Sequence, residues 1–125
     1  MQITQVTPIF RIFDYAKAIE FYVDWLGFKI DWEHRFEDHS PIYMQVSKDG
    51  MTLHLSEHHG DATPGARTYV ICTDLKAYHE ELSRKNYKYN RPGYEKTFYG
   101  TYAVQVTDPF GNNITFNEPI QQKED

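Results

Sequence analysis

Ala103-Val-Gln-Val-Thr-Asp-Pro-Phe-Gly-Asn-Asn-Ile-Thr-Phe-Asn-Glu-Pro119 is the stretch that decides the fold, because it predicts a strand, a tight turn and a second strand. In Ala103–Thr107 two valines alternate with small or polar residues, as in a strand with one buried face. Asp108–Gly111 has the chemistry of a turn: the Asp side chain can cap it, Pro fixes φ, and Gly tolerates a positive φ. Asn113–Glu118 then alternates again. The result is a hairpin with one apolar and one polar face.

Composition limits the class of protein. The chain has 125 residues, of which 40% are hydrophobic and 25% charged, as expected of a domain with a hydrophobic core. A formal net charge of −5 argues against a nonspecific nucleic-acid binder. The single cysteine, Cys72, excludes an intramolecular disulfide and fits a reducing compartment. We find neither an apolar run of membrane-spanning length nor a signal-peptide pattern, and therefore expect a cytoplasmic protein.

The same order of elements occurs twice along the chain. Asp14 and Asp74 lie 60 positions apart, and each precedes a run of apolar residues with helical spacing, so each is expected to cap a helix. The segments Thr52–Glu57 and Asn113–Glu118 share one polar–apolar alternation at a spacing of 61. Two matches at nearly the same spacing predict a duplicated βαβββ unit.

The polar segment His58–Gly65 is the expected boundary between the two copies. We therefore expect one domain over residues 1–125, with a first module at about 1–59 and a second at about 66–120. In the strand expected at Phe28–Phe36, alternation places Trp32 on one side and Asp31 on the other. The other expected elements are strands at Ile3–Phe13, Ile42–Ser47, Met51–Glu57, Ala66–Asp74 and Tyr87–Tyr89, a helix from Asp14 to Gly27, and a second helix ending near Asn86.

Several of these motifs resemble a known superfamily. Asp14 followed by Ala18–Tyr22 and Leu26–Phe28, together with Asp108–Phe116, resembles the vicinal oxygen chelate superfamily, which includes glyoxalase I, extradiol dioxygenases and bleomycin resistance proteins. The resemblance covers nearly the whole chain. It implies an α+β fold, in which two βαβββ modules form a curved mixed sheet around a cleft.

The positions of metal ligands distinguish the branches of this superfamily. By the resemblance, the ligand positions of the metal-dependent members correspond to Thr7, His54, Arg67 and Thr115. Only His54 is a plausible ligand, and Arg67 would place a permanent positive charge beside the ion. We therefore expect no metal and no other cofactor.

The remaining resemblance is to the bleomycin resistance proteins, through Leu53–Glu57 and Asn113–Asn117. It implies a homodimer that binds a drug in a cleft and sequesters it without catalytic residues. Aromatic side chains in an acidic setting suit a ligand that is planar, cationic or both. The residues expected to contact such a small molecule are Trp32, Tyr43, Gln45, His54, Arg67, Tyr69, Tyr99, Tyr102, Gln105 and Thr115.

Other functions stay open at this point. One is a metalloenzyme of the glyoxalase or dioxygenase type, and another is a metal-free isomerase or lyase with His54 as general base. A pure interaction module is a third. The mixture of basic and aromatic residues in Arg84–Tyr102 is compatible with single-stranded nucleic acid, but the acidic composition opposes this reading, and we expect neither a nucleic-acid nor a membrane partner.

Overall fold

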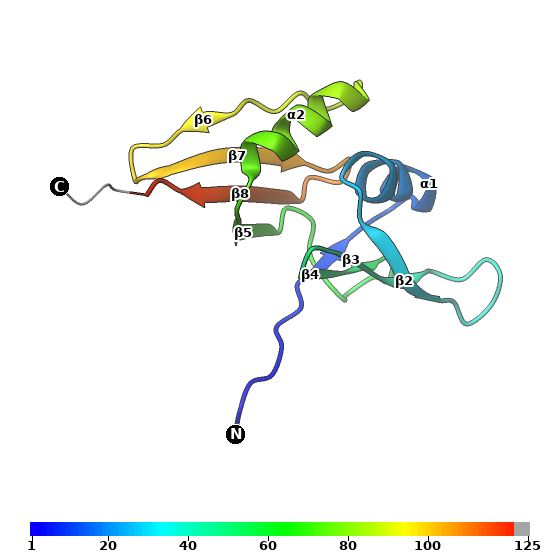
Figure 1. Ribbon diagram of the computed structural model, residues 1–125. Coiled ribbons are helices and arrows are strands. Elements are labelled where there is room, and N and C mark those ends of the chain that lie inside the picture. Colours follow the sequence, from blue (N-terminus) through cyan, green and yellow to red (C-terminus); the bar gives the residue numbers. More distant parts are fainter. Residues whose placement is uncertain (122–125) are drawn as a thin grey trace. The chain divides into compact units, whose positions relative to one another are not determined.

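Two four-stranded mixed sheets form the framework of the protein in a computed structural model, which describes residues 1–121 (Figure 1). Their strand orders, β1-β4-β3-β2 and β5-β8-β7-β6, are equivalent, since in each the outer parallel pair joins the first strand to the fourth. The predicted α+β class and duplicated βαβββ order are thereby confirmed, while the cleft stays a prediction. The elements are β1 (Ile9–Arg11), α1 (Tyr15–Ala18), η1 (Ile19–Trp25), β2 (Lys29–His34), β3 (Tyr43–Lys48), β4 (Met51–Ser56), β5 (Arg67–Ile71), α2 (Leu75–Lys85), β6 (Glu95–Lys96), β7 (Thr101–Thr107) and β8 (Asn113–Pro119).

Contacts between residues divide the chain into two units, each of which is described by itself. The first unit comprises Met1–Ala66 and the turn Asp108–Asn112, and the second comprises Arg67–Thr107 and the chain from Asn113 onward. The last four positions of the expected domain lie outside the described residues. Within residues 1–121, no helix has the length and apolar character needed to cross a membrane.

The helix of the first unit begins as predicted but changes its winding. The Asp14 carboxylate accepts the backbone N–H of Lys17 at 2.9 Å, so the predicted N-cap is confirmed. After α1 the chain continues as the π-helical segment η1, where the Leu26 N–H donates to the Phe21 carbonyl five residues back, at 2.9 Å. The predicted helix is therefore present, but its second half is π-helical rather than α-helical. Gly27, with φ of 87°, ends the helix where predicted.

The second helix is capped by a different residue from the one expected. Asp74 adopts a left-handed conformation with φ of 57°, and its side chain makes no capping hydrogen bond. The Glu118 carboxylate takes this role, accepting the backbone N–H groups of Asp74 at 3.1 Å and Leu75 at 3.2 Å. On the helix side of the second sheet, the rings of Tyr78 and Phe116 meet edge to face at 5.5 Å. The predicted Asp74 cap was wrong because a carboxylate from β8 reaches the orphaned N–H groups instead.

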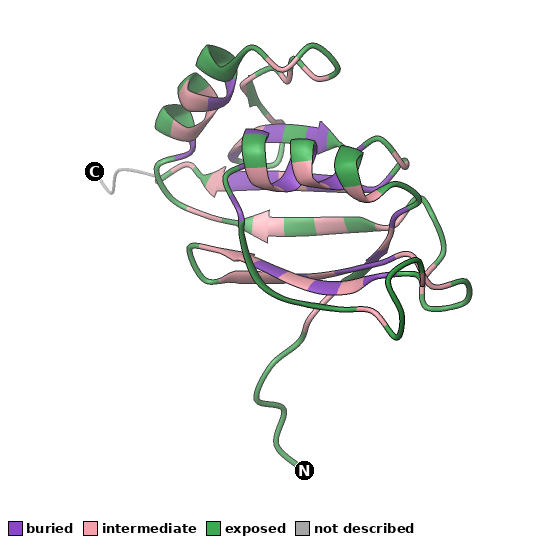
Figure 2. Cartoon of the chain, turned by 90° about the vertical axis from the view of Figure 1, so that its right-hand side faces the viewer, coloured by how far each residue is buried: buried purple, intermediate pink, exposed green. Residues whose placement is uncertain are grey.

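Two expected strands differ in the structure. The strand predicted at Ile3–Phe13 is reduced to β1, because its ladder with β4 joins only three pairs of residues, beginning at Ile9. Ile3 and Val6 are 70% and 79% exposed, in an N-terminal segment that lies outside the sheet (Figure 2). The short strand of the second module forms at Glu95–Lys96 rather than at Tyr87–Tyr89.

The turn between β7 and β8 is a buried polar center of the first unit. The Asp108 carboxylate accepts the backbone N–H groups of Phe110 at 2.9 Å and Asn112 at 2.8 Å, which confirms the predicted capping of the turn. Its other oxygen accepts the Tyr22 hydroxyl at 2.6 Å. The Asn112 amide donates to the Arg11 carbonyl at 2.8 Å. Burial and the neighboring Asp108 carboxylate raise the pKa of Tyr22 well above its ordinary value.

Candidate functional site

Four of the predicted ligand-binding residues gather on one face of the first sheet. Trp32 lies on β2, Tyr43 and Gln45 on β3, and His54 on β4. Gln45 is directly opposite both His54 and Trp32 in the two ladders, and residues opposite one another project from the same side of a sheet. Trp32 is 42% exposed, and the other three are partly buried. We call these four residues the aromatic face.

The rings of the aromatic face form a compact cluster. Trp32 and Tyr43 are stacked, with centroids 6.0 Å apart and planes at 11°. His54 meets both rings edge on, at 5.3 Å from Trp32 and 5.2 Å from Tyr43. A flat, partly exposed indole beside a phenol offers a stacking surface to a planar ligand.

Hydrogen bonds link the polar atoms of this face into a chain. The Tyr43 hydroxyl lies 2.7 Å from His54 Nδ1, and His54 Nε2 lies 3.0 Å from Gln45 Oε1. Gln45 Nε2 donates to a carboxylate oxygen of Asp31 at 3.0 Å. Both nitrogens of the imidazole are therefore engaged, and the chain ends at a carboxylate.

Asp31 and Trp32 share this face because β2 contains a bulge. The pairing with β3 shifts between Ile30 and Trp32, so alternation is interrupted at Asp31. The Asp31 carboxylate accepts hydrogen bonds from Gln45 and from the Ser47 hydroxyl, each at 3.0 Å. These two bonds, and to a smaller extent the nearby Lys29, hold the pKa of Asp31 below its usual value. The predicted separation of Asp31 and Trp32 onto opposite sides was wrong, because the bulge brings both onto one face. Asp31 is a site residue that the sequence prediction did not include.

Burial shifts the pKa of two side chains in the aromatic face. It lowers the pKa of His54, because desolvation disfavors the charged imidazolium. Burial also raises the pKa of the Tyr43 phenol, and the negative charge of Asp61 adds to this shift. Near neutral pH the face therefore presents a neutral imidazole and a protonated phenol.

Further rings extend the aromatic face toward the chain that follows β2 and β4. The His58 ring lies 6.5 Å from Tyr43 and 6.4 Å from Phe36, and Phe36 in turn meets His34 edge to face at 4.9 Å. Phe36 is 78% exposed. These three residues are not among the ligand-binding residues predicted from the sequence, although His34 and Trp32 alternate on the same strand.

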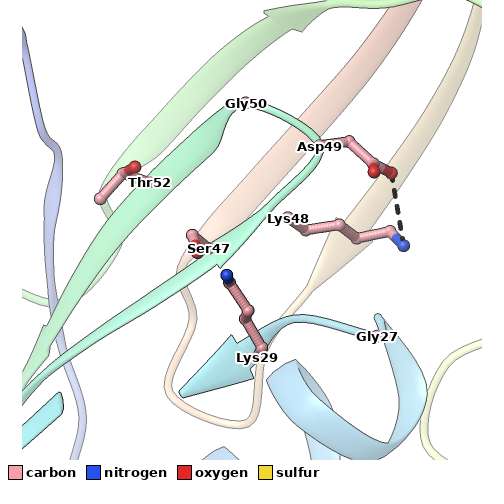
Figure 3. Close-up of a pocket in the computed structure, with 7 residues that line it drawn as sticks. All are labelled: Gly27, Lys29, Ser47, Lys48, Asp49, Gly50 and Thr52. Carbon is pink, nitrogen blue, oxygen red and sulfur yellow. Dashed lines mark ion pairs between the residues drawn. The ribbon is translucent and has the colours of Figure 1, made fainter. Parts of the chain in front are cut away.

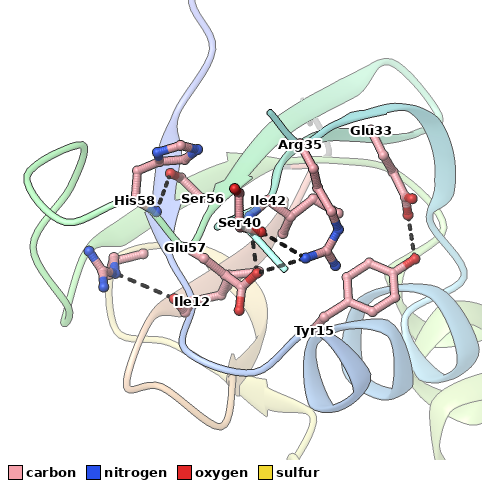
Figure 4. A network of polar contacts seen from close by, with 10 residues as sticks. Ile12, Tyr15, Glu33, Arg35, Ser40, Ile42, Ser56, Glu57 and His58 are labelled. Atoms are coloured by element: carbon pink, nitrogen blue, oxygen red, sulfur yellow. Dashed lines mark hydrogen bonds and ion pairs between the residues drawn. The ribbon is translucent and has the colours of Figure 1, made fainter. Parts of the chain in front are cut away.

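A network of polar contacts fixes the segment between β2 and β3, as Figure 4 shows. The Arg35 guanidinium donates to the Ser40 carbonyl at 3.0 Å and lies 3.8 Å from the Glu57 carboxylate. Glu57 also accepts the Ile42 backbone N–H at 3.1 Å, and the Tyr15 ring lies under the Arg35 guanidinium at 5.3 Å. The start of β3, which carries half of the aromatic face, is thereby held in place.

A polar pocket of about 530 Å³ opens beside the turn between β3 and β4 (Figure 3). It contains two lysines, one of which pairs with Asp49 at 3.5 Å. None of the predicted ligand-binding residues lines it, so this pocket is separate from the aromatic face. Its lining residues are Gly27, Lys29, Ser47, Lys48, Asp49, Gly50 and Thr52.

In the second unit, four predicted residues share one face of the sheet. Arg67 and Tyr69 on β5 lie opposite Asn113 and Thr115 on β8, and Gln105 on β7 lies opposite Thr115 from the other side. Gln105 Nε2 donates to Asn113 Oδ1 at 3.2 Å. Tyr69 is 56% exposed. This face is polar and open, with one aromatic side chain among the four predicted residues.

The structure places the other two predicted residues of the second unit elsewhere. Tyr102 projects from the opposite side of the sheet, where its ring stacks on Tyr94 at 5.0 Å. Tyr99 lies in the turn before β7, with its ring 5.1 Å from Phe98. Neither therefore joins Gln105 and its neighbors on one face.

The positions aligned with metal ligands hold few suitable donors. The Thr7 hydroxyl accepts a hydrogen bond from the Gln5 side chain at 2.8 Å, and both nitrogens of His54 have partners within the aromatic face. In the part of the chain that the structure describes, no group of three or more His, Cys, Asp or Glu side chains is arranged to hold a metal ion.

Two sheets of equivalent order define the fold of glyoxalases and bleomycin resistance proteins, and comparison with solved structures agrees. The fold is similar to that of TnmS3, an antibiotic binding protein from Streptomyces sp. CB03234, with 25% identity and a TM-score of 0.73 over 95% of this chain and 98% of that one. It is also similar to a bleomycin-binding protein complexed with bleomycin, with 20% identity and a TM-score of 0.69 over 93% and 98% of the two chains. A bleomycin resistance determinant encoded on the transposon Tn5 shows the same fold, with 20% identity and a TM-score of 0.71 over 94% and 98%.

The sequence itself matches a family model over almost its full length. The model describes a glyoxalase superfamily protein and matches residues 1–123. This chain therefore belongs to the glyoxalase superfamily, and the resemblance seen in the sequence is confirmed. No curated protein sequence matches the chain.

Proposed function

We propose that this protein binds a planar aromatic small molecule, preferably a cationic one, and sequesters it without changing it chemically. The observation that carries the proposal is the stacked Trp32–Tyr43 pair, which is partly exposed. The Asp31 carboxylate lies on the same face of the sheet. Ring faces attract flat and positively charged groups, and a carboxylate adds to the attraction for a cation.

The properties of the whole chain support this proposal. Its net charge of −5 favors association with a cation. TnmS3 is an antibiotic binding protein, and the bleomycin-binding protein has the same fold. An antibiotic with a planar ring system is therefore the ligand class that we propose.

The state of His54 favors binding over catalysis. A general base needs a free lone pair directed at the substrate. In this structure His54 Nδ1 and Nε2 are within 2.7 Å and 3.0 Å of Tyr43 and Gln45. Proton abstraction by His54 would first require one of these two contacts to break.

Tryptophan fluorescence tests the proposal directly. The chain has two tryptophans, of which Trp25 is buried with 2% exposure and Trp32 is the exposed one. Titration with bleomycin, and separately with protonated aminoacridine, is expected to quench Trp32 emission in a saturable manner. Trp32→Phe removes the signal, and calorimetry on this variant is expected to show weaker binding by about fivefold, since a stacking contact contributes about 1 kcal/mol.

Two controls separate sequestration from the other functions. Phe98→Ala removes a fully exposed ring of the second unit, and it is expected to leave binding unchanged. Ligand recovered after incubation is expected to have an unchanged mass and chromatographic retention. Conversion of the ligand, or activity that depends on an added divalent metal, would instead support the enzymatic alternatives. An absence of saturable binding to every planar compound tested would contradict the proposal.

A further inference from the structure

The hydrogen-bonded chain across the aromatic face has a direction, which is set at its carboxylate end. An ionized carboxylate can only accept hydrogen bonds, so Gln45 must turn its NH₂ group toward Asp31. The carbonyl oxygen of the same amide then faces His54 Nε2, at 3.0 Å. Because an amide oxygen also only accepts, Nε2 must carry the imidazole proton.

The direction continues to the other end of the chain. A neutral imidazole protonated at Nε2 has a lone pair at Nδ1, and the Tyr43 hydroxyl lies 2.7 Å from that atom. The hydroxyl proton of Tyr43 is therefore committed to His54. Its oxygen retains lone pairs, so toward a bound molecule it acts as an acceptor.

We propose that Asp31 and Gln45 are positioning residues that make Tyr43 accept rather than donate a hydrogen bond, so that the site selects planar ligands with an N–H or O–H donor at the ring edge. This inference rests on the proposed function and names the ligand class that its site prefers. Acceptor-only ligands are disfavored, because they would place a lone pair against the lone pairs of Tyr43.

The groups around Asp31 maintain the direction of the chain without being links in it. The Ser47 hydroxyl donates at 3.0 Å to the Asp31 oxygen that Gln45 does not contact, and the Lys29 ammonium lies 3.8 Å from the same oxygen. Both contacts favor the ionized carboxylate. Ser47→Ala is therefore the matched control, since it removes a contact to Asp31 and leaves every link from Asp31 to Tyr43 in place.

Asp31→Asn is the decisive variant, because it permits the chain to reverse. The Asn amide can donate to Gln45, whose own NH₂ group can then donate to His54 Nε2. The imidazole proton moves to Nδ1 and points at Tyr43, and the hydroxyl is released to donate to a ligand. Gln45→Met cuts the chain in the middle and removes the constraint on the tautomer without changing the charge.

The first experiment needs no ligand. ¹⁵N NMR of the histidine ring nitrogens distinguishes the two neutral tautomers, and His54→Gln identifies the His54 signals among the six histidines. Wild type and Ser47→Ala are expected to show the Nε2-protonated form. Asp31→Asn and Gln45→Met are expected to show a large share of the Nδ1-protonated form. A wild-type protein in the Nδ1-protonated form, or variants with an unchanged tautomer, would overturn the proposal.

The second experiment measures selectivity with three planar probes: protonated aminoacridine, N-methylacridinium and N-methylacridone. The first two are cations with and without a donor, so the ratio of their affinities is insensitive to the charge lost in Asp31→Asn. We expect wild type to prefer aminoacridine by about fivefold, as one net hydrogen bond allows. Asp31→Asn is expected to reduce this ratio toward one, and Gln45→Met, which leaves the charge unchanged, is expected to improve N-methylacridone relative to N-methylacridinium.

The two experiments separate the possible failures. If no probe binds while the tautomers behave as expected, the proposed function fails and the assignment of the hydrogen-bonded chain stands. If the probes bind with equal affinity ratios in wild type and Asp31→Asn, the selectivity role of Asp31 is wrong and the proposed function stands.

Discussion

The open faces of the two sheets share a framework but differ in chemistry. Gln45 and Gln105 occupy equivalent places, opposite His54 in the first unit and opposite Thr115 in the second. At the position equivalent to Tyr43, the second unit has Ala103, which pairs with β8 as Tyr43 pairs with β4. The conserved strand order therefore supplies the geometry, and two side chains determine whether a hydrogen-bonded aromatic cluster forms on it.

Equivalent acidic residues also have different roles in the two units. Glu57 directly follows β4, and Glu118 lies near the end of the equivalent strand β8. The Glu57 carboxylate accepts a backbone N–H just before β3, whereas Glu118 caps α2. Asp14 caps its helix with its side chain, whereas Asp74 does not. In both units these backbone N–H groups need a hydrogen-bond acceptor, but the residue that supplies this acceptor differs between the units.

The largest expected difference in stability lies between the two hairpin turns. Asp108 is 4% exposed and accepts hydrogen bonds from Tyr22 and from two backbone N–H groups. Asp108→Ala would leave these donors buried and unpaired, and we expect a loss of about 3–5 kcal/mol in the free energy of unfolding, measured by urea denaturation.

The corresponding turn of the first sheet supplies the control. The Asp49 side chain is 86% exposed, and its backbone has a φ of 49°, which Asn tolerates well. Asp49→Asn is expected to change stability by less than about 0.5 kcal/mol. Similar losses in the two variants would show that the Asp108 center is not a special source of stability.

Substitutions that copy the second unit into the first are expected to have the next largest effect. Tyr43→Ala and His54→Thr install the residues found at the equivalent places, and each removes a ring from the aromatic face. We expect the affinity for aminoacridine to fall by about tenfold in each, by calorimetry. Thr115→Ala is the matched control in the second unit. A comparable loss of affinity in this variant would contradict binding at the aromatic face of the first unit.

The helix caps of the two units are expected to make a smaller difference to the free energy of unfolding. Glu118→Ala removes both hydrogen bonds to the start of α2, so a loss of about 1–2 kcal/mol is expected, against about 1 kcal/mol for Asp14→Ala. Asp74→Asn is expected to be nearly neutral, because the Asp74 side chain makes no capping bond and Asn accepts the left-handed conformation. Urea denaturation measures all three, and a clear loss in Asp74→Asn would contradict the structural assignment of the cap.

Much of the fold could be predicted because it depends on short-range rules. Alternation in β7 and β8, the Asp108 turn and the Asp14 cap each follow from a few neighboring residues. The grouping of Tyr43, Gln45 and His54 on one face likewise follows from alternation together with register. Alternation also contained an unused signal, since Tyr102 has the same parity as the buried Val104 and therefore belongs to the helix side.

The missed features depend on contacts that no local pattern contains. The bulge that brings Trp32 onto the same face as Asp31 arises from the pairing of β2 with β3. Glu118 replaces Asp74 as a cap because β8 brings it to the start of α2, about 44 residues away in sequence. Both corrections come from long-range pairing, which alternation within one strand does not encode.

The smallest expected effect is a dependence of stability on pH, which arises in the first unit from His54 and has no counterpart at Thr115 in the second unit. Burial lowers the pKa of folded His54 below the ordinary value of 6.5, so the unfolded chain takes up the proton more readily. The corresponding stability is present above pH 6.5 and is lost as the pH falls through that value. The contribution of Asp31 is separate, because its pKa lies below 3.8 and its stabilization is lost only in stronger acid.

We therefore expect the urea midpoint of the wild type to fall more than that of His54→Gln when the pH is lowered from about 7.5 to about 5.5, around the ordinary histidine pKa. The other histidines are common to both proteins, so their contributions cancel in the comparison. Thr115→Ala, at the equivalent position of the second unit, is expected to follow the wild-type profile, because threonine does not titrate. Parallel profiles for wild type and His54→Gln would mean that His54 is as well solvated in the folded protein as in the unfolded chain.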